Sequence, residues 1–324
     1  MTNPSRDKPS VCWVVTDGRA GIESQALGLA EAIADLTPLE IAAKRIAVRA
    51  PWRFLPWRLW RDPLSALSGD ARLEPPYPDL WIGCGRLSVP LSIAMKRKAA
   101  GPFVVQVQDP RAPSSLFDLV VPPDHDGLVG ENVFPIIGSP NRLKAGAAPS
   151  NTVAGKPSLA VLIGGPNRAF RLTKADAERL CSTLAGLAPS CALMTVTTSR
   201  RTPPFMAAML RSLSSTGNVH VWIAGEDGQS LNPYPAMLGA CDAILVTEDS
   251  VNMAVEAAST GKPVHVLPLA RKPFVSAAKF DAFHEGLERR GASRRFDGAL
   301  GDWTYEPLHE TRRAAAEILK RWRG

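Results

Sequence analysis

Glycine-rich and polar turns that directly follow apolar runs are the places where this sequence could do chemistry. Three of these turns are Asp17-Gly18-Arg19-Ala20-Gly21, Gly83-Cys84-Gly85-Arg86 and Gly164-Gly165-Pro166-Asn167-Arg168. In a parallel α/β sheet, ligands bind beyond the carboxyl ends of the strands. Glycines there let a ligand approach the backbone, and paired glycine N–H groups can face a phosphate. The turns therefore predict a site for a phosphorylated ligand; for each, a tight turn without a ligand is the alternative.

The densest polar pattern is TEDSVNMAVE, which follows the apolar run AILV. It predicts a helix with Ser250 as its N-cap and Asn252 in its first turn. The partial positive charge and spare N–H donors of a helix N-terminus suit a diphosphate. Glu256 lies one to two turns further on, where its carboxylate could accept hydrogen bonds from ribose hydroxyls. A capped helix with a solvated glutamate is the alternative.

Two further stretches are less specific. Arg200 and Arg201 follow another expected strand, where they would either clamp a phosphate or face water. His125 lies between two aspartates, but no HxxxH or cysteine pair accompanies it, so a polar surface loop is expected. The sequence has no GxSxG and no Walker A motif. We therefore expect no metal site and no cofactor.

Alternating strand-like and helix-like segments must position these turns. The expected strands are 11–16, 40–48, 79–82, 103–107, 119–121, 159–163, 192–197, 219–223, 243–246 and 264–267. The expected helices are 24–36, 88–100, 173–187, 204–213, 250–259 and an amphipathic basic helix at 310–322. This alternation is typical of βαβ units with a parallel sheet.

The length of 324 residues indicates two domains. The stretch 141–157, rich in small residues, glycine and proline, is the best candidate for a linker. We expect one Rossmann-like domain at 1–145 and a second at 156–305. The terminal helix within 306–324 is expected to pack back on the first domain.

Composition sets the class of protein. With 45% hydrophobic and 21% charged residues, the chain can form two cores, which excludes a mostly disordered protein. There is no 18-residue apolar run, and the polar start MTNPSRDKPS argues against a secretory signal. Five scattered cysteines without CxxC spacing indicate buried free thiols in a reducing cytosol. A cytoplasmic protein is expected, and peripheral contact with the inner face of a membrane is left open.

Basic residues exceed acidic ones by 38 − 31 = 7, which favours an anionic partner. The segment 50–61, APWRFLPWRLWR, concentrates this charge among large apolar side chains. Its candidates for contact with an anionic membrane surface are Trp52, Arg53, Trp57, Arg58 and Trp60. Alternatively, the tryptophans pack beneath the N-terminal sheet and the arginines face water. Nucleic acid binding would rest on net charge alone and is not expected.

Six stretches resemble the "elongated mitochondria" fission-protein family, known from plants and with many uncharacterised bacterial members. They are TDGRAGIESQALGLAEAI, PDLWIGCGRLSVP, VVQVQDPR, FDLVVPPDHD, LIGGPNRAFRL and VTEDSVNMAVEAASTGKPVHVLPL, and the resemblance covers nearly the whole chain as a bacterial-type member. The plant member is linked to recruiting a dynamin-related GTPase to mitochondria. More distantly, the layout is similar to two-Rossmann (GT-B) glycosyltransferases, which implies two doubly wound domains facing a central cleft.

The GT-B resemblance assigns the first domain to the acceptor and the second to the nucleotide-sugar. Gly18 and Gly21 match the acceptor-side loop, and the donor site would contain Gly164, Gly165, Ser250, Asn252 and Glu256. Relatives commonly have histidine where this chain has Ile22. If that histidine is the general base, its role here is vacant or falls to Asp17, Glu23 or Asp109.

The expected function is transfer of a sugar from a nucleotide-diphosphate donor, without a metal and with inversion at the anomeric carbon. The resemblance offers a lipid-linked or envelope acceptor as one candidate, and the sequence does not identify the acceptor. The alternative is a catalytically silent scaffold that binds a membrane or another protein.

Overall fold

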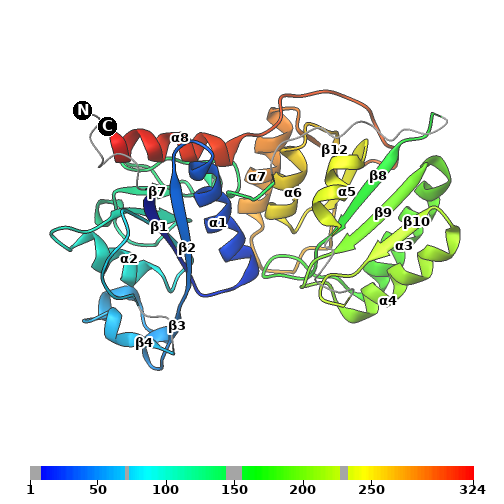
Figure 1. The fold of residues 1–324 in the computed structure, drawn as a ribbon. Helices are drawn as coiled ribbons and strands as arrows, with labels where there is room; N and C mark the ends of the chain where they lie inside the picture. Colours follow the sequence, from blue (N-terminus) through cyan, green and yellow to red (C-terminus); the bar gives the residue numbers. More distant parts are fainter. Residues whose placement is uncertain (1–8, 70–72, 144–154, 227–232) are drawn as a thin grey trace, which may run out of the picture. The chain divides into compact units, whose positions relative to one another are not determined.

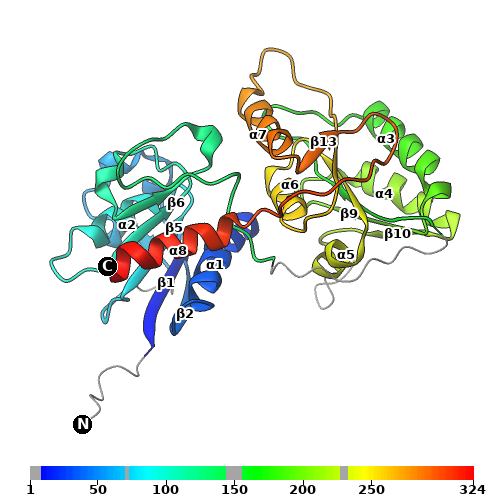
Figure 2. The same ribbon diagram turned by 90° about the horizontal axis from the view of Figure 1, so that it is seen from above.

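The computed structural model describes residues 9–69, 73–143, 155–226 and 233–324 (Figures 1 and 2). The chain divides into two compact units. Unit 1 comprises Met1–Arg142 and His309–Gly324, and unit 2 comprises Leu143–Leu308. Most of the expected linker at 141–157 lies outside the described residues.

Unit 1 is built on a five-stranded parallel sheet in the order β2-β1-β5-β6-β7. Its strands are β1 (Ser10–Thr16), β2 (Leu39–Arg45), β5 (Leu80–Cys84), β6 (Phe103–Val107) and β7 (Leu119–Val121). The expected strand at 40–48 breaks after β2, and its end forms β3 (Ala47–Val48), which pairs antiparallel with β4 (Leu67–Ser68). The direction in which strands are added reverses between β1 and β5.

Three α-helices cover the sheet of unit 1: α1 (Ala20–Ala34), α2 (Val89–Lys96) and α8 (Glu310–Arg323). Helix α8 packs against α1, and the two helices are neighbours in both ribbon views (Figures 1 and 2). Ile33 of α1 and Ile318 of α8 are buried in one core cluster. Glu310 is buried as well, and its Oε2 accepts a hydrogen bond of 2.8 Å from the N–H of Ile137. The last helix of the chain is therefore an integral part of unit 1.

Unit 2 has a six-stranded parallel sheet in the order β10-β9-β8-β11-β12-β13. Its strands are β8 (Ser158–Ile163), β9 (Leu193–Thr198), β10 (Val219–Trp222), β11 (Ala243–Thr247), β12 (Val264–Leu267) and β13 (Ser293–Arg295). Its α-helices are α3 (Lys174–Leu187), α4 (Pro204–Leu213), α5 (Tyr234–Ala240), α6 (Val251–Ala258) and α7 (Ala278–Arg289). Here the order of strands reverses between β8 and β11.

Short 3₁₀ helices occupy several connections. They are η1 (Trp52–Phe54), η2 (Trp57–Leu59), η3 (Leu64–Ala66), η4 (Ser114–Leu116), η5 (Asp124–Asp126), η6 (Ala188–Ser190) and η7 (Ser214–Thr216).

The sequence explains this architecture because central strands of both sheets are continuous apolar runs. All six residues of β8 and all five of β11 are buried, as expected for parallel strands covered on both faces. The predicted fold class, two doubly wound α/β sheets, is confirmed. All five cysteines are buried and free, as expected. Within the described residues, no helix is long and apolar enough to cross a membrane.

Candidate functional site

The strand order predicts a ligand site in unit 2 at the carboxyl ends of β8 and β11. In open α/β sheets, ligands bind where the strand order reverses, because neighbouring connections leave in opposite directions there. Gly164 and Gly165 follow β8, and Asp249 and Ser250 follow β11. The loop after β9, which carries Arg201, reaches the same edge. Three turns that the sequence singled out thus meet at one edge of the sheet.

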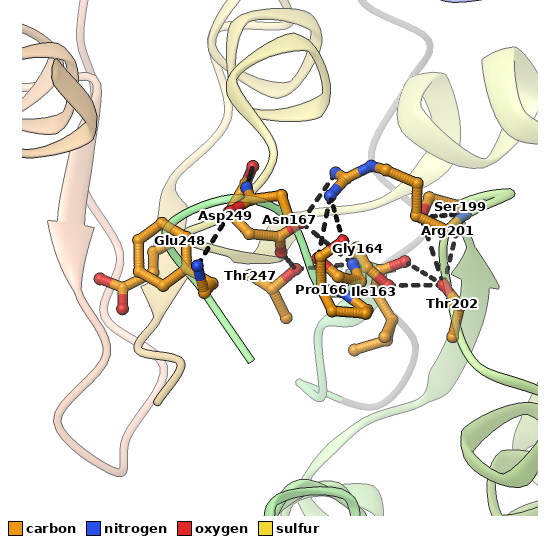
Figure 3. Close-up of polar contacts among 12 residues, drawn as sticks. Ile163, Gly164, Pro166, Asn167, Ser199, Arg201, Thr202, Thr247, Glu248 and Asp249 are labelled. Carbon is orange, nitrogen blue, oxygen red and sulfur yellow. Dashed lines mark hydrogen bonds and ion pairs between the residues drawn. The ribbon is translucent and has the colours of Figure 1, made fainter. Parts of the chain in front are cut away.

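Asp249 joins these turns (Figure 3). Its side chain has no exposed surface. One carboxylate oxygen, Oδ2, accepts hydrogen bonds from the N–H of Gly165 at 3.0 Å and from Nη2 of Arg201 at 2.8 Å. The other, Oδ1, accepts the hydroxyl of Thr247 at 2.7 Å. A buried carboxylate needs such partners, and here each one comes from a different strand end.

The two glycine N–H groups are used inside this network. The N–H of Gly164 donates to Oγ1 of Thr247 at 2.8 Å, and that of Gly165 donates to Asp249. The sequence led us to expect these groups to face a phosphate. In the structure they donate to Thr247 and Asp249 instead, so they hold the turn in place, and a ligand at this edge would need other hydrogen-bond donors.

Neither glycine leaves room for a side chain. A Cβ on Gly164 would lie 2.2 Å from Oδ1 of Asp249, and one on Gly165 would lie 2.3 Å from the backbone oxygen of Arg201. Both distances are far below van der Waals contact. Glycine is needed here because neighbouring chain segments approach closely, which is the structural alternative that the sequence left open.

Gly164→Ala is therefore expected to destabilise the protein by about 1–3 kcal/mol, the range for overpacking a tightly packed site. The matched control is Gly186→Ala, an exposed position in α3 where an added Cβ meets nothing within 4 Å. Because alanine is the better helix former, the control is expected to be neutral or to stabilise by about 0.5–1 kcal/mol. Urea denaturation measures both changes, and equal changes would contradict the close packing at Gly164.

The network continues on the side of β9. Nη1 of Arg201 donates to the backbone oxygen of Gly165 at 2.9 Å, and the hydroxyl of Thr202 donates to that of Gly164 at 2.5 Å (Figure 3). From the other direction, Nδ2 of Asn167 donates to the backbone oxygen of Asp249 at 3.3 Å. These bonds make the three turns one rigid platform at the strand ends.

Two of the predicted donor-site residues carry polar groups that have no hydrogen-bond partner among the described residues. Ser250 is the N-cap residue of α6, as predicted, but its side chain makes no capping hydrogen bond. Its hydroxyl has no hydrogen-bond partner within the described parts of the chain. Arg200 is exposed and, among the same residues, makes no ion pair or hydrogen bond. Asn252 is partly exposed in the first turn of α6.

Glu256 contacts a different element. Its Oε2 accepts a hydrogen bond of 2.5 Å from the hydroxyl of Tyr234 in α5. The residue as a whole is partly exposed, whereas its carboxyl group is buried, and burial raises the pKa of this carboxyl to about 7. Its predicted contact with a ribose would compete with Tyr234, and that contact stays a prediction.

Sequence reasoning missed two residues near this edge. His284 of α7 is buried, and its Nε2 lies 2.8 Å from the backbone oxygen of Glu248; burial lowers the pKa of the imidazole. Phe274 is fully exposed and has a φ of 61°, a left-handed conformation that is unusual for a non-glycine residue. The loop carrying Phe274 is held to the Gly164 turn, since the N–H of Lys272 donates to the backbone oxygen of Ala169 at 2.8 Å. In the sequence, only the composition of its loop could have drawn attention to Phe274. Helix α7 was not predicted because no apolar run marks it.

Unit 1 repeats this arrangement at the carboxyl ends of β1 and β5. Gly18 follows β1 with a φ of 75°, which favours glycine. The helix begins at Ala20, four residues earlier than expected, so Gly21 and Ile22 lie in its first turn rather than in a loop. Ile22 packs on the turn after β5, because a Cβ on Gly85 would lie 3.1 Å from its Cγ2. Ile22, where the resemblance led us to expect a histidine, therefore faces the reversal point of this sheet.

The three candidate bases of unit 1 differ in the hydrogen bonds and ion pairs that their carboxylates make. Both oxygens of Glu23 accept from Arg45, at 2.7 and 3.0 Å, and Asp17 is paired with Arg19 at 2.7 Å. Asp109 follows β6, and only its Oδ1 is engaged among the described residues, by the N–H of Arg111 at 2.8 Å.

The loop that carries Asp109 has an unusual backbone. Gln108 and Arg111, on either side, have φ values of 72° and 50°. Non-glycine residues in this region are disfavoured and cluster at functional sites. Nε2 of Gln108 donates to Oε1 of the buried Gln25 at 2.9 Å. Because Gln25 lies three residues after Ile22 on α1, the Asp109 loop reaches the helix face that carries Ile22.

Comparison with known proteins decides the family. A sequence profile described as mitochondrial fission ELM1 matches residues 20–322. The chain belongs to the mitochondrial fission ELM1 family. The mitochondrial fission protein ELM1 of Arabidopsis thaliana is 30% identical over 279 residues, which cover 75% of this ELM1-family chain and 64% of the plant protein. The chain thus spans less than two thirds of the length of that relative.

A second ELM1-family relative matches over nearly its whole length. It is the uncharacterized protein RP120 of Rickettsia prowazekii (strain Madrid E), 25% identical over 353 residues, with 95% of this chain and 97% of the relative covered. The resemblance noted from the sequence motifs is confirmed.

Among solved structures, the S. aureus MnaA–UDP co-structure shares 12% identity at a TM-score of 0.50, covering 97% of this chain and 89% of MnaA. The glycosyltransferase SnogD from Streptomyces nogalater shares 14% identity at a TM-score of 0.48, covering 98% and 95%. At these identities the likeness concerns the fold alone. This ELM1-family chain has a GT-B-like fold of two Rossmann-like units, as expected.

Proposed function

We propose that the protein binds a nucleotide-diphosphate sugar at the strand ends of unit 2 and transfers the sugar to an acceptor hydroxyl. The observation that carries this proposal is the Asp249 network, which holds three loops rigid at the reversal point of a doubly wound sheet. A preorganised platform of this kind is what binding of a charged ligand requires. The GT-B-like fold supports the same assignment.

The donor's diphosphate would lie above this platform. Arg200 is exposed without a partner among the described residues, and Arg201 keeps 41% of its side chain exposed while paired with Asp249. Together with the open hydroxyl of Ser250 and the N-terminus of α6, they supply donors for phosphate oxygens. Positive potential here would stabilise the charge that develops on the departing diphosphate.

The acceptor hydroxyl needs a base, and Asp109 has the fewest protein partners of the three candidate carboxylates. Glu23 and Asp17 are held by arginines, whereas one oxygen of Asp109 has no partner within the described residues. In the proposed reaction Asp109 takes the proton of the acceptor hydroxyl, and the oxygen attacks the anomeric carbon. The bond from that carbon to the diphosphate oxygen breaks, and its electron pair leaves with the nucleoside diphosphate.

The test is thermal stabilisation by nucleotides. UDP and UDP-sugars are expected to raise the melting temperature in a concentration-dependent way, because a ligand that binds only the folded state stabilises it. Arg200→Ser is expected to weaken UDP binding about tenfold or more, the loss of one charge-assisted hydrogen bond. The control is Arg289→Ser, an exposed arginine near the end of α7, before β13 and thus at the opposite edge of the sheet.

Two outcomes would overturn the proposal. A melting temperature unchanged by every nucleotide and nucleotide-sugar tested would exclude the donor site. If Arg200→Ser and the unsubstituted protein bind UDP with equal affinity, the diphosphate does not bind at this edge of the sheet.

One observation favours a second function. Ile22 cannot accept a proton, and it packs on Gly85 at the position where the resemblance led us to expect a histidine. A protein that keeps the fold but lacks that base would serve as a catalytically silent scaffold. Such a scaffold is expected to bind UDP but to turn over no UDP-sugar. Asp109→Asn is then expected to leave the affinity for UDP unchanged.

A further inference from the structure

Residues 51–61 form a segment between β3 and β4 that combines aromatic side chains with arginines. Two short 3₁₀ helices, η1 and η2, make up most of it, and it lies beside the antiparallel pair of β3 and β4 in Figure 1. It belongs entirely to unit 1 and carries none of the residues used in the proposed function.

The tryptophans hold this segment on unit 1. Trp60 is only 6% exposed and lies in a core cluster, and Trp52 and Trp57 pack against that cluster. The indole N–H of Trp57 donates to the backbone oxygen of Arg111 at 3.2 Å. The sequence made these rings candidates for membrane contact, but the structure uses them as the inner face of the segment.

Its outer face is made by other residues. Phe54 and Leu59 have 69% and 53% of their surface exposed, and they are two of only six large apolar residues exposed in the described parts of the chain. Arg53, Arg58 and Arg61 are exposed beside them. Residues 44–61 contain no carboxylate, so these charges have no local counter-ion until Asp62.

We propose that this outer face docks on an anionic phospholipid surface. Apolar tips flanked by guanidinium groups fit a membrane interface, where the apolar side chains enter the headgroup–acyl boundary and the arginines meet anionic headgroups. The exposed leucine favours lipid over a nucleic acid, because an aliphatic side chain does not stack on bases. This inference does not depend on nucleotide binding or on sugar transfer.

Docking would place functional loops of unit 1 near the lipid. The side chain of Arg86, in the turn after β5, donates to the backbone oxygen of Arg53, and Trp57 bonds to Arg111 in the loop that carries Asp109. The segment is thus tied directly to both turns at the carboxyl edge of this sheet. A surface held there would bring lipid headgroups to the edge where the acceptor is expected.

The test is co-sedimentation with vesicles at low salt. The protein is expected to sediment with vesicles of phosphatidylcholine and phosphatidylglycerol at 3:1 and to be released from them by high salt. It is not expected to sediment with vesicles of pure phosphatidylcholine. Arg53→Ser with Arg58→Ser is expected to weaken partitioning about thirtyfold, since each basic residue contributes about fivefold. Phe54→Ser with Leu59→Ser is expected to weaken it at least about tenfold.

Exposed positions elsewhere in unit 1 provide matched controls. Val129→Ser removes an apolar side chain that is 85% exposed, and Arg312→Ser removes an exposed charge on α8. Both should sediment like the unsubstituted protein, and all variants should keep its melting temperature because the substituted side chains are exposed.

Four results would overturn the proposal. The first is no sedimentation with anionic vesicles at low salt. The second is equal sedimentation of Phe54→Ser/Leu59→Ser and Val129→Ser. The third is a dimer in gel filtration that becomes a monomer in Phe54→Ser/Leu59→Ser. In that case a second copy of the chain, rather than lipid, would cover this outer face. Binding to DNA that is insensitive to the Phe54 and Leu59 changes, without vesicle binding, would assign the arginines to nucleic acid.

Discussion

Replacing Asp249 with alanine is expected to lower the free energy of unfolding of unit 2 by about 2–6 kcal/mol. The substitution deprives the N–H of Gly165 and the hydroxyl of Thr247 of their acceptor in a buried place. Each buried group left without a partner costs about 1–3 kcal/mol. Arg201 would lose its ion pair as well, but its partly exposed guanidinium can turn to water. Urea denaturation, followed by circular dichroism, measures the change.

Two variants make this test specific. Asp249→Asn keeps one acceptor oxygen and is expected to lie between the alanine variant and the unsubstituted protein. Asp281→Ala breaks another aspartate–arginine pair of unit 2, in which both side chains are substantially exposed, at 38% for Asp281 and 46% for Arg271. Exposed pairs contribute at most about 1 kcal/mol. If Asp249→Ala costs no more than Asp281→Ala, the network does not hold the strand ends together.

The sequence predicted the buried strands of this protein well, for a simple reason. The strand VHVL at 264–267 and the helix at 204–213 coincide with β12 and α4, and LAVLI lies within β8. A parallel strand covered on both faces must be apolar throughout, and its ends are marked by glycine, proline or polar residues. Such a pattern is local, so one sequence is enough to detect it.

Elements at the margin of the sheet were missed because they lack that pattern. The edge strand β13 consists of Ser293, Arg294 and Arg295, and only the serine is buried. Helix α7 buries Phe283, His284 and Leu287, but acidic and basic residues surround them and its N-cap residue makes no side-chain hydrogen bond. For such elements tertiary packing, rather than an apolar run or a cap, determines the structure.

The site shows the same division between local and distant information. That ligand loops follow strands is a rule of the fold, and it located the turns at Gly164 and Asp249 from the sequence. The role of Asp249 as their common acceptor was not predictable, because its partners Gly165 and Arg201 are 84 and 48 residues away along the chain. Only the strand order, with β8 beside β11, brings these residues together.

The pairing of Glu256 with Tyr234 was missed for a related reason, since α5 was not expected, and it has a measurable consequence. Burial raises the pKa of the Glu256 carboxyl to about 7 in the folded protein, whereas an unfolded glutamate titrates near 4.5. Between these values the unfolded chain releases the proton and the folded protein keeps it. The free energy of unfolding is therefore expected to fall as the pH rises from about 4.5 to 7, by about 3 kcal/mol from this group, and to lose nothing further from it above that range.

Glu256→Gln isolates this effect, because glutamine does not titrate and all other groups remain. The difference in unfolding free energy between the variant and the unsubstituted protein should grow in favour of the variant from pH 5 to pH 8. Tyr234→Phe is the matched control: it removes the hydroxyl that stabilises the charged carboxylate, so at pH 8 it should destabilise. A pH-independent difference for Glu256→Gln would contradict the raised pKa. If Glu256→Gln also weakens the thermal shift by UDP while Tyr234→Phe strengthens it, Glu256 contacts the ribose as the sequence predicts, because loss of the tyrosine hydroxyl frees its carboxyl for that contact.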